Sequence, residues 1–264
     1  LVSDWSSDVC SSDLGVPAPL RAYCFGGFRL ERQGTVLPEP RWKRKKAQEL
    51  FLLLLLRPGY SVPKEQAVDL LFGDADPAKA ANRLYVAIHE INRALKEGCG
   101  VPEAAALRNG VVALLDHVVE EVDVEKYETL IRVADQLHPD QPELSEELYE
   151  KAAELYGEFL PHRPYDEWLS RMRDELEIKQ QRALGRLAEA ARKRGEAARE
   201  ERFRRLLVEL SPLAEDAVQA LLQFYVREGR RADAARLYET FARRLAAEFG
   251  CEPLAETKRI ADGS

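Results

Sequence analysis

The sequence predicts a mainly α-helical protein, in which a winged helix-turn-helix with a small β-sheet and a wing is followed by an all-α, tetratricopeptide-like helical bundle. Three observations predict this fold class. Residues 77–115 combine an amphipathic helix with a short β-hairpin. From Asp123 onward, apolar residues recur with helical spacing almost without a break. In that half, Gly195 and Gly229 stand 34 residues apart, which is the tetratricopeptide period.

The front half opens with short strands and two helices. Residues 23–31 and the segment around residues 35–37 are predicted strands, because apolar and β-branched residues are interrupted there by turn residues. A first helix is predicted from the basic run at residue 41 through Leu56, before a Pro-Gly stop. A second helix is predicted to begin near residues 61–65 and to end at Phe72-Gly73.

A third helix, residues 77–97, completes the predicted helix-turn-helix. Asp76 and Pro77 suit its N-cap and first position, and Gly98 suits its end. Its apolar residues share one face, whereas amide and basic residues gather half a turn away. The inner face is predicted to hold Leu84, Ile88, Ile91 and Leu95, and the outer face Lys79, Asn82, Val86, His89 and Arg93.

The wing is predicted from two apolar runs, residues 105–108 and 111–115, that flank Asn109-Gly110. Asn-Gly is a strong hairpin signal because both residues of such a turn need positive φ. Arg108 would then stand beside the tip of the hairpin.

The back half, residues 123–249, is predicted to be a stack of helices. Apolar residues keep one-face spacing around Gly229, whereas Arg204 falls where an apolar residue is expected in the unit around Gly195. Because a lone helix pair cannot bury its apolar face, these helices should stack as one bundle.

Composition narrows the function classes. The net charge of −7 conceals an asymmetry, since residues 16–116 carry 15 Lys/Arg against 11 Asp/Glu and residues 117–264 carry 24 against 32. The four cysteines lie far apart, which argues against a zinc site or a disulfide framework and favours a reducing cytoplasm. We find no membrane-length apolar run, phosphate-binding loop or nucleophile motif. We therefore expect no enzyme activity, no cofactor and no membrane partner.

We expect three segments. Residues 1–15 resemble a translated sequencing adapter and are predicted to be non-native or disordered. Residues 16–117 are predicted to form the winged-helix domain, and residues 118–264 the helical activator domain.

The outer face of the third helix suggests sequence-specific binding to double-stranded DNA. Its side chains are expected to read base edges in the major groove, with Asn82 suited to adenine and Arg93 to guanine. The basic residues nearby are expected to neutralise phosphates, and Arg108 to enter the minor groove. The predicted base readers are Lys79, Asn82, Arg83, His89 and Arg93; the predicted phosphate or minor-groove contacts are Arg41, Lys43, Arg44, Lys45, Lys46, Lys96 and Arg108. The alternative interpretation is that these residues are ordinary surface side chains that contact only water.

The order and spacing of several short motifs resemble the antibiotic-regulatory-protein (SARP) type of transcriptional activators. These proteins join an OmpR/PhoB-type winged helix to a bacterial transcriptional activator domain. The sequence departs from the usual pattern with Phe72 in place of Trp, Ile91-Asn92 in place of Leu-Arg, and Val111-Val112 where a tyrosine is usual. The motifs that carry the resemblance are residues 25–28, 44–50, 91–95, 123–127, 153–160, 228–232 and 248–253.

The resemblance implies an activator that recruits RNA polymerase and binds repeated promoter sites as a dimer or side-by-side pair. Two alternatives stay open. The chain could be a tetratricopeptide-like scaffold that binds proteins without DNA, or the C-terminal part of a larger regulator whose other domains precede residue 15.

Overall fold

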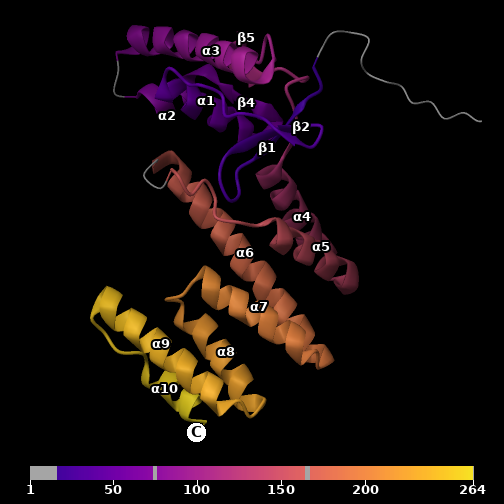
Figure 1. Ribbon diagram of the computed structural model, residues 1–264, viewed down its shortest axis with the longest axis vertical. Helices are drawn as coiled ribbons and strands as arrows, with labels where there is room; N and C mark the ends of the chain where they lie inside the picture. Colours follow the sequence, from indigo (N-terminus) through magenta and orange to yellow (C-terminus); the bar gives the residue numbers. More distant parts are fainter. Residues whose placement is uncertain (1–16, 74–75, 164–166, 264) are drawn as a thin grey trace, which may run out of the picture. The chain divides into compact units, whose positions relative to one another are not determined.

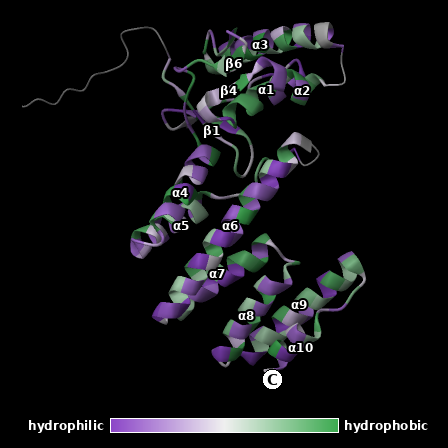
Figure 2. Cartoon of the chain, turned by 180° about the vertical axis from the view of Figure 1, so that it is seen from behind, coloured by the Kyte–Doolittle hydropathy of each residue, from purple (hydrophilic) through white to green (hydrophobic). Residues whose placement is uncertain are grey.

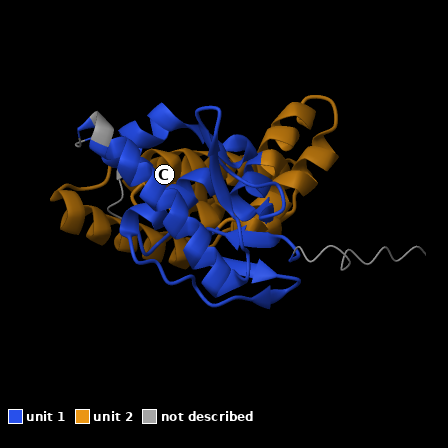
Figure 3. Cartoon of the chain, turned by 90° about the horizontal axis from the view of Figure 1, so that it is seen from above, with its two compact units in different colours: residues 1–128, 157–168 blue, residues 129–156, 169–264 orange. Residues whose placement is uncertain are grey.

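The structure is a computed structural model that describes residues 17–73, 76–163 and 167–263. The predicted non-native segment, residues 1–15, lies outside the described residues. The chain divides into two compact units (Figure 3). The first comprises residues up to Glu128 together with Gly157–Trp168, and the second comprises Thr129–Tyr156 and the residues from Leu169 onward.

The first unit contains a four-stranded sheet with the order β3-β2-β1-β7. Its strands are β1 (Leu20–Tyr23), β2 (Arg29–Arg32), β3 (Thr35–Val36) and β7 (Val119–Val122). The strand predicted over residues 23–31 is therefore wrong in extent, because Gly26 and Gly27 take positive φ and turn the chain between β1 and β2. Strand β7 was not predicted. It runs parallel to β1, whereas the other neighbours are antiparallel.

Three helices of the first unit pack around one apolar core. They are α1 (Lys45–Leu55), α2 (Lys64–Phe72) and α3 (Pro77–Cys99) (Figure 1). The four residues predicted for the inner face of α3 are buried against α1, whose leucines are buried as well. The first helix begins at Lys45 rather than at residue 41, because Arg44 is extended. A short 3-10 turn, η2 (Pro58–Tyr60), follows α1.

The wing confirms the predicted hairpin. Strands β5 (Ala105–Arg108) and β6 (Val111–Leu114) pair with Arg108 opposite Val111. The turn residues Asn109 and Gly110 have φ of 50° and 77°, as a two-residue turn with both φ positive requires. Residues 61–63, predicted as the start of the second helix, instead form β4 (Ser61–Pro63), which pairs with β6 and completes a three-stranded sheet.

Helix α3 ends two residues later than predicted. Gly98 lies inside the helix, where a Cβ atom would come within 3.2 Å of Pro40 Cα, so its role is to allow close packing. The helix ends at Cys99, and Gly100 follows with φ of 67°, the left-handed conformation common after a helix C-terminus.

The described part of the second unit is helical. Figure 2 shows hydrophilic and hydrophobic residues alternating along its helices, as one-sided burial requires. Of the described residues, none forms a helix long and apolar enough to cross a membrane. The helices are α4 (Asp123–Leu137), whose first residues belong to the first unit, α5 (Pro142–Leu155), α6 (Glu167–Arg194), α7 (Ala197–Leu210), α8 (Glu215–Arg227), α9 (Arg231–Phe249) and α10 (Ala255–Asp262).

The prediction of stacked helices in the back half is confirmed. Gly195 and Gly229 both have positive φ and separate α6 from α7 and α8 from α9. Helix α8 packs against α7, α9 and α10. Its buried Leu222 and Tyr225 share one cluster with Phe241 of α9.

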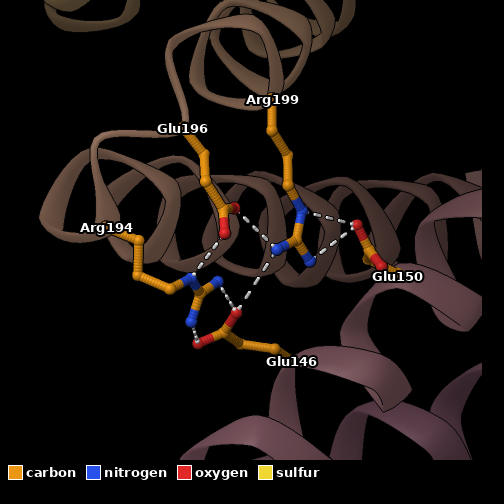
Figure 4. Close-up of polar contacts among 5 residues, drawn as sticks. All are labelled: Glu146, Glu150, Arg194, Glu196 and Arg199. Carbon is orange, nitrogen blue, oxygen red and sulfur yellow. Dashed lines mark hydrogen bonds and ion pairs between the residues drawn. The ribbon is translucent and has the colours of Figure 1, made fainter.

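Two groups of ion pairs join these helices. Arg204, at the position where an apolar residue was expected, donates to Glu200 at 2.7 Å, and Arg227 of α8 donates to the same carboxylate at 2.6 Å. Only 2% of the Glu200 side chain is exposed. A second group joins the helices α5, α6 and α7 (Figure 4). In it, Glu146 and Glu150 of α5 accept from Arg194 and Arg199, and both arginines also pair with Glu196.

Candidate nucleic-acid interface

A groove in the first unit brings the start of α1 and the outer face of α3 together. Its volume is about 570 Å³. The predicted phosphate contacts Arg44, Lys45 and Lys46 line it together with the predicted base readers Asn82 and Arg83. Its remaining lining is apolar and comes from Ala47, Leu71, Phe72, Val86 and Ala87.

The outer face of α3 carries exposed polar side chains. Lys79, Asn82, Arg83 and His89 are all exposed. Among the residues that the structure describes, none makes a hydrogen bond or ion pair with these four side chains. They are therefore free to contact another molecule.

Arg93 departs from the sequence prediction. Its side chain is only 17% exposed. It donates to Glu90 from Nε at 2.8 Å and from Nη2 at 2.6 Å, and Nη2 also donates to the carbonyl oxygen of Arg41 at 2.8 Å. Glu97 accepts from Nη1. Because its guanidinium is committed to these partners, the expectation that Arg93 reads a guanine is corrected.

The same contacts hold the basic segment before α1 against α3. Glu90 is buried, and it accepts a 2.7 Å hydrogen bond from the backbone N–H of Lys43 as well as the Arg93 bonds. The Arg93 guanidinium, followed by the Lys43 N–H, lowers the pKa of Glu90 to about 2 despite its burial. We call Glu90, Arg93 and the backbone of residues 41–43 the α3 latch. It positions Arg44, Lys45 and Lys46 beside α3.

Asn92 also has a structural role. Its Oδ1 accepts from the backbone N–H groups of Ala104 and Ala105 at 2.8 Å, and its Nδ2 donates to the Ala105 carbonyl oxygen at 2.9 Å. The amide thus joins α3 to β5. An arginine at this position could not accept the two N–H bonds, which gives a physical account of this departure from the family pattern.

The other predicted contacts lie outside the groove. Arg41, Lys43 and Lys96 are exposed but do not line it. Arg108 is exposed in the wing, next to the Asn109-Gly110 turn. Lys79, His89 and Arg93 do not line the groove either. The structure thus gathers five of the twelve predicted residues in the groove and leaves the other seven outside it.

Sequence reasoning missed two features of the site. Leu71, Phe72 and Ala87 give the groove an apolar lining that the sequence analysis did not assign to the site. The Glu90–Arg93 pair was also missed, although three-residue spacing on a helix is a signal that such a pair can form.

Residues 122–263 match the bacterial transcriptional activator domain family, and this match covers more than half of the chain. The chain belongs to that family. A comparison of the sequence with curated proteins found no match.

Its fold is similar to that of EmbR from Mycobacterium tuberculosis, solved in complex with a low affinity phosphopeptide. The TM-score is 0.62 at 17% sequence identity, and the match covers 92% of this chain. It covers 64% of the EmbR chain, so this activator family protein spans somewhat less than two thirds of that protein's length. At this identity the similarity concerns the fold alone.

Proposed function

We propose that this protein is a sequence-specific DNA-binding transcriptional activator of the bacterial cytoplasm, acting on nucleoid DNA through an OmpR/PhoB-type winged helix. Helix α3 docks in the major groove with Lys79, Asn82, Arg83 and His89 toward base edges. The basic residues before and at the start of α1, with Lys96 and Arg108, contact the backbone or the minor groove.

The observation that carries this proposal is the groove itself. Phosphate contacts fix the register of a protein on DNA, and base contacts supply the specificity. In the groove, three cations from the start of α1 stand beside an amide and a guanidinium from α3. The two kinds of side chain thus lie on one surface, as simultaneous binding to a phosphate strand and to a base edge requires, and Lys45 and Lys46 stay exposed although both pair with Glu49.

The test is DNA binding by the full chain as a function of salt. With about five phosphates neutralised, the slope of log K against log salt should lie near −4 to −5. Lys45→Ala should weaken binding to all duplexes about equally and make that slope shallower by about one. Asn82→Ala should instead lower the preference for selected over random duplexes.

Two further variants sharpen the test. Arg93→Ala should resemble Lys45→Ala rather than Asn82→Ala, because Arg93 positions the basic segment and does not reach a base. Lys151→Ala removes an exposed lysine of α5 and serves as the matched control, with an unchanged slope. A binding constant that does not change with salt concentration would contradict the proposal.

The helical domain, in this proposal, recruits RNA polymerase while the protein binds repeated sites as a homodimer or side-by-side pair. The membership of the family supports this assignment. Transcription by purified polymerase from a template with selected sites should rise when the full chain is added. Bound DNA without a rise in transcript would remove the recruitment step and leave DNA binding in place.

A protein-binding scaffold is the second candidate function, and the stack of α7 to α10 is the observation that favours it. A scaffold that does not bind DNA would give no mobility shift that bulk DNA competes away. This outcome separates the two functions.

A further inference from the structure

The outer face of α3 contains one aliphatic side chain among polar ones. Val86 is 36% exposed, and it stands one helical turn after Asn82 and three residues before His89. Its neighbour Ala87 is buried. Val86 therefore lies toward the middle of the surface that the proposed function places in the major groove.

Ordinary helix stability does not account for a valine at this position. β-branched residues form helices less readily than the lysine, glutamine or glutamate that exposed positions favour. Val86 also lines the same groove as Asn82 and Arg83, beside Leu71 and Phe72. The apolar lining thus continues from the interior of the groove onto the outer surface of α3.

The major groove of DNA offers one apolar group to such a side chain, which is the C5-methyl group of thymine. Asn82, with its free amide, suits the N6 and N7 atoms of adenine. Four residues along a helix correspond to about 6 Å, and base pairs follow one another at about 3.4 Å. The two side chains therefore reach base pairs that lie no more than about two steps apart.

We infer that Val86 is a specificity-determining residue that recognises a thymine methyl group, within about two base-pair steps of an adenine that Asn82 reads. This inference rests on the proposed function, since it assumes that α3 enters the major groove. It narrows the class of DNA that the protein selects to duplexes in which an adenine and a thymine occur at that spacing on either strand.

The experiment begins with duplexes that the full chain selects from a random pool. Each thymine of a selected duplex is then replaced by deoxyuridine, which lacks only the methyl group, and the dissociation constant is measured at constant salt. At one thymine the replacement should weaken binding about fourfold, as about 0.8 kcal/mol for one buried methyl group corresponds to.

The variant Val86→Ala should bind the thymine and deoxyuridine duplexes with nearly equal affinity. Val36→Ala is the matched control, because Val36 is an exposed valine of β3 outside the groove, and it should keep the fourfold ratio. Replacing adenines one at a time by 7-deazaadenine should reveal a second sensitive position within two steps, and Asn82→Ala should abolish that sensitivity. Circular dichroism checks that each variant is folded.

The outcomes are distinguishable. Salt-sensitive, selective binding without any thymine whose methyl group matters would overturn the role of Val86 and leave the proposed function intact. A ratio that persists in Val86→Ala would assign the methyl contact to another side chain and overturn the inference as well. Failure to bind any duplex would remove the proposed function together with this inference.

Discussion

At the residue scale, Arg93 shows how a local partner changes the role of a side chain. The helical period correctly places it near the outer face of α3. What the period cannot show is that Glu90, one turn earlier, has a buried carboxylate that needs a cation. A buried charge is costly to leave unpaired. Arg93 therefore turns along its own helix toward Glu90, and the basic segment gains a carbonyl contact at Arg41.

The α3 latch should also make the first unit sensitive to acid. The pKa of Glu90 is lower in the folded protein than its ordinary value of 4.5, so the pair stabilises the folded state fully above that value and progressively less as pH falls toward about 2. Glu90→Gln should reduce the free energy of unfolding by up to about 3 kcal/mol at pH 6. The difference between wild type and variant should shrink as pH approaches 2.

Urea unfolding followed by tryptophan fluorescence provides the measurement, because the described tryptophans Trp42 and Trp168 both belong to the first unit. Glu97→Gln is the control, since Glu97 pairs with Arg93 but is mostly exposed. A difference between wild type and Glu90→Gln that is constant from pH 6 to pH 2 would contradict the assignment.

At the element scale, the sequence predicted α1, α2, α3 and the wing, but it misplaced short strands. The Asn109-Gly110 turn has an unmistakable local signal, and its hairpin was predicted to within one residue. Strands β4 and β7 have no such signal. Each is stabilised by a partner distant in sequence, β6 for the former and β1 for the latter, and period-2 patterns are too short to detect in three or four residues.

Arg204 illustrates the same limit in the second unit. An arginine among apolar positions weakened the repeat signal, because the pattern could not reveal that Arg204 and Arg227 both pair with Glu200. Glu200→Gln should lower the stability of the second unit by about 3 kcal/mol, since it leaves a poorly exposed Arg204 without its counter-charge.

Thermal unfolding monitored by the helical circular dichroism signal would show this loss. The control is Glu228→Gln, whose carboxylate pairs with Arg227 near the surface and should change stability by less than about 1 kcal/mol. Equal effects of the two substitutions would contradict the importance of the buried carboxylate.

At the scale of the whole molecule, charge composition predicted two parts of different character, a basic front half and an acidic back half. The excess of basic residues before residue 117 and of acidic residues after it indicated a front half suited to a polyanion. The predicted domain boundary after residue 117 stays a prediction. The grouping of Gly157–Trp168 with the first unit could not be predicted from the sequence. It depends on backbone bonds such as that from the Leu160 N–H to the Cys24 carbonyl oxygen, which join distant segments.

The division of the chain into two units leads to a prediction about which backbone amides DNA protects from hydrogen exchange. A ligand that binds only the folded state stabilises it by about 2.7 kcal/mol at a hundredfold excess over the dissociation constant. Hydrogen exchange of the full chain with a selected duplex should slow in α1, α3 and the wing, and it should stay unchanged in α8 to α10. A random duplex at high salt is the control. Slowing confined to α8 to α10 would show that DNA contacts the second unit, and it would contradict the proposal.

The α3 latch has one more consequence, for the thermodynamics of association. A flexible basic arm loses conformational entropy when a ligand orders it, and that loss subtracts from the affinity. Here the backbone of residues 41–43 is already tied to α3 through Glu90 and Arg93. The backbone entropy of residues 41–43 is therefore lost during folding, and the binding of a duplex, as proposed, does not have to order this segment again.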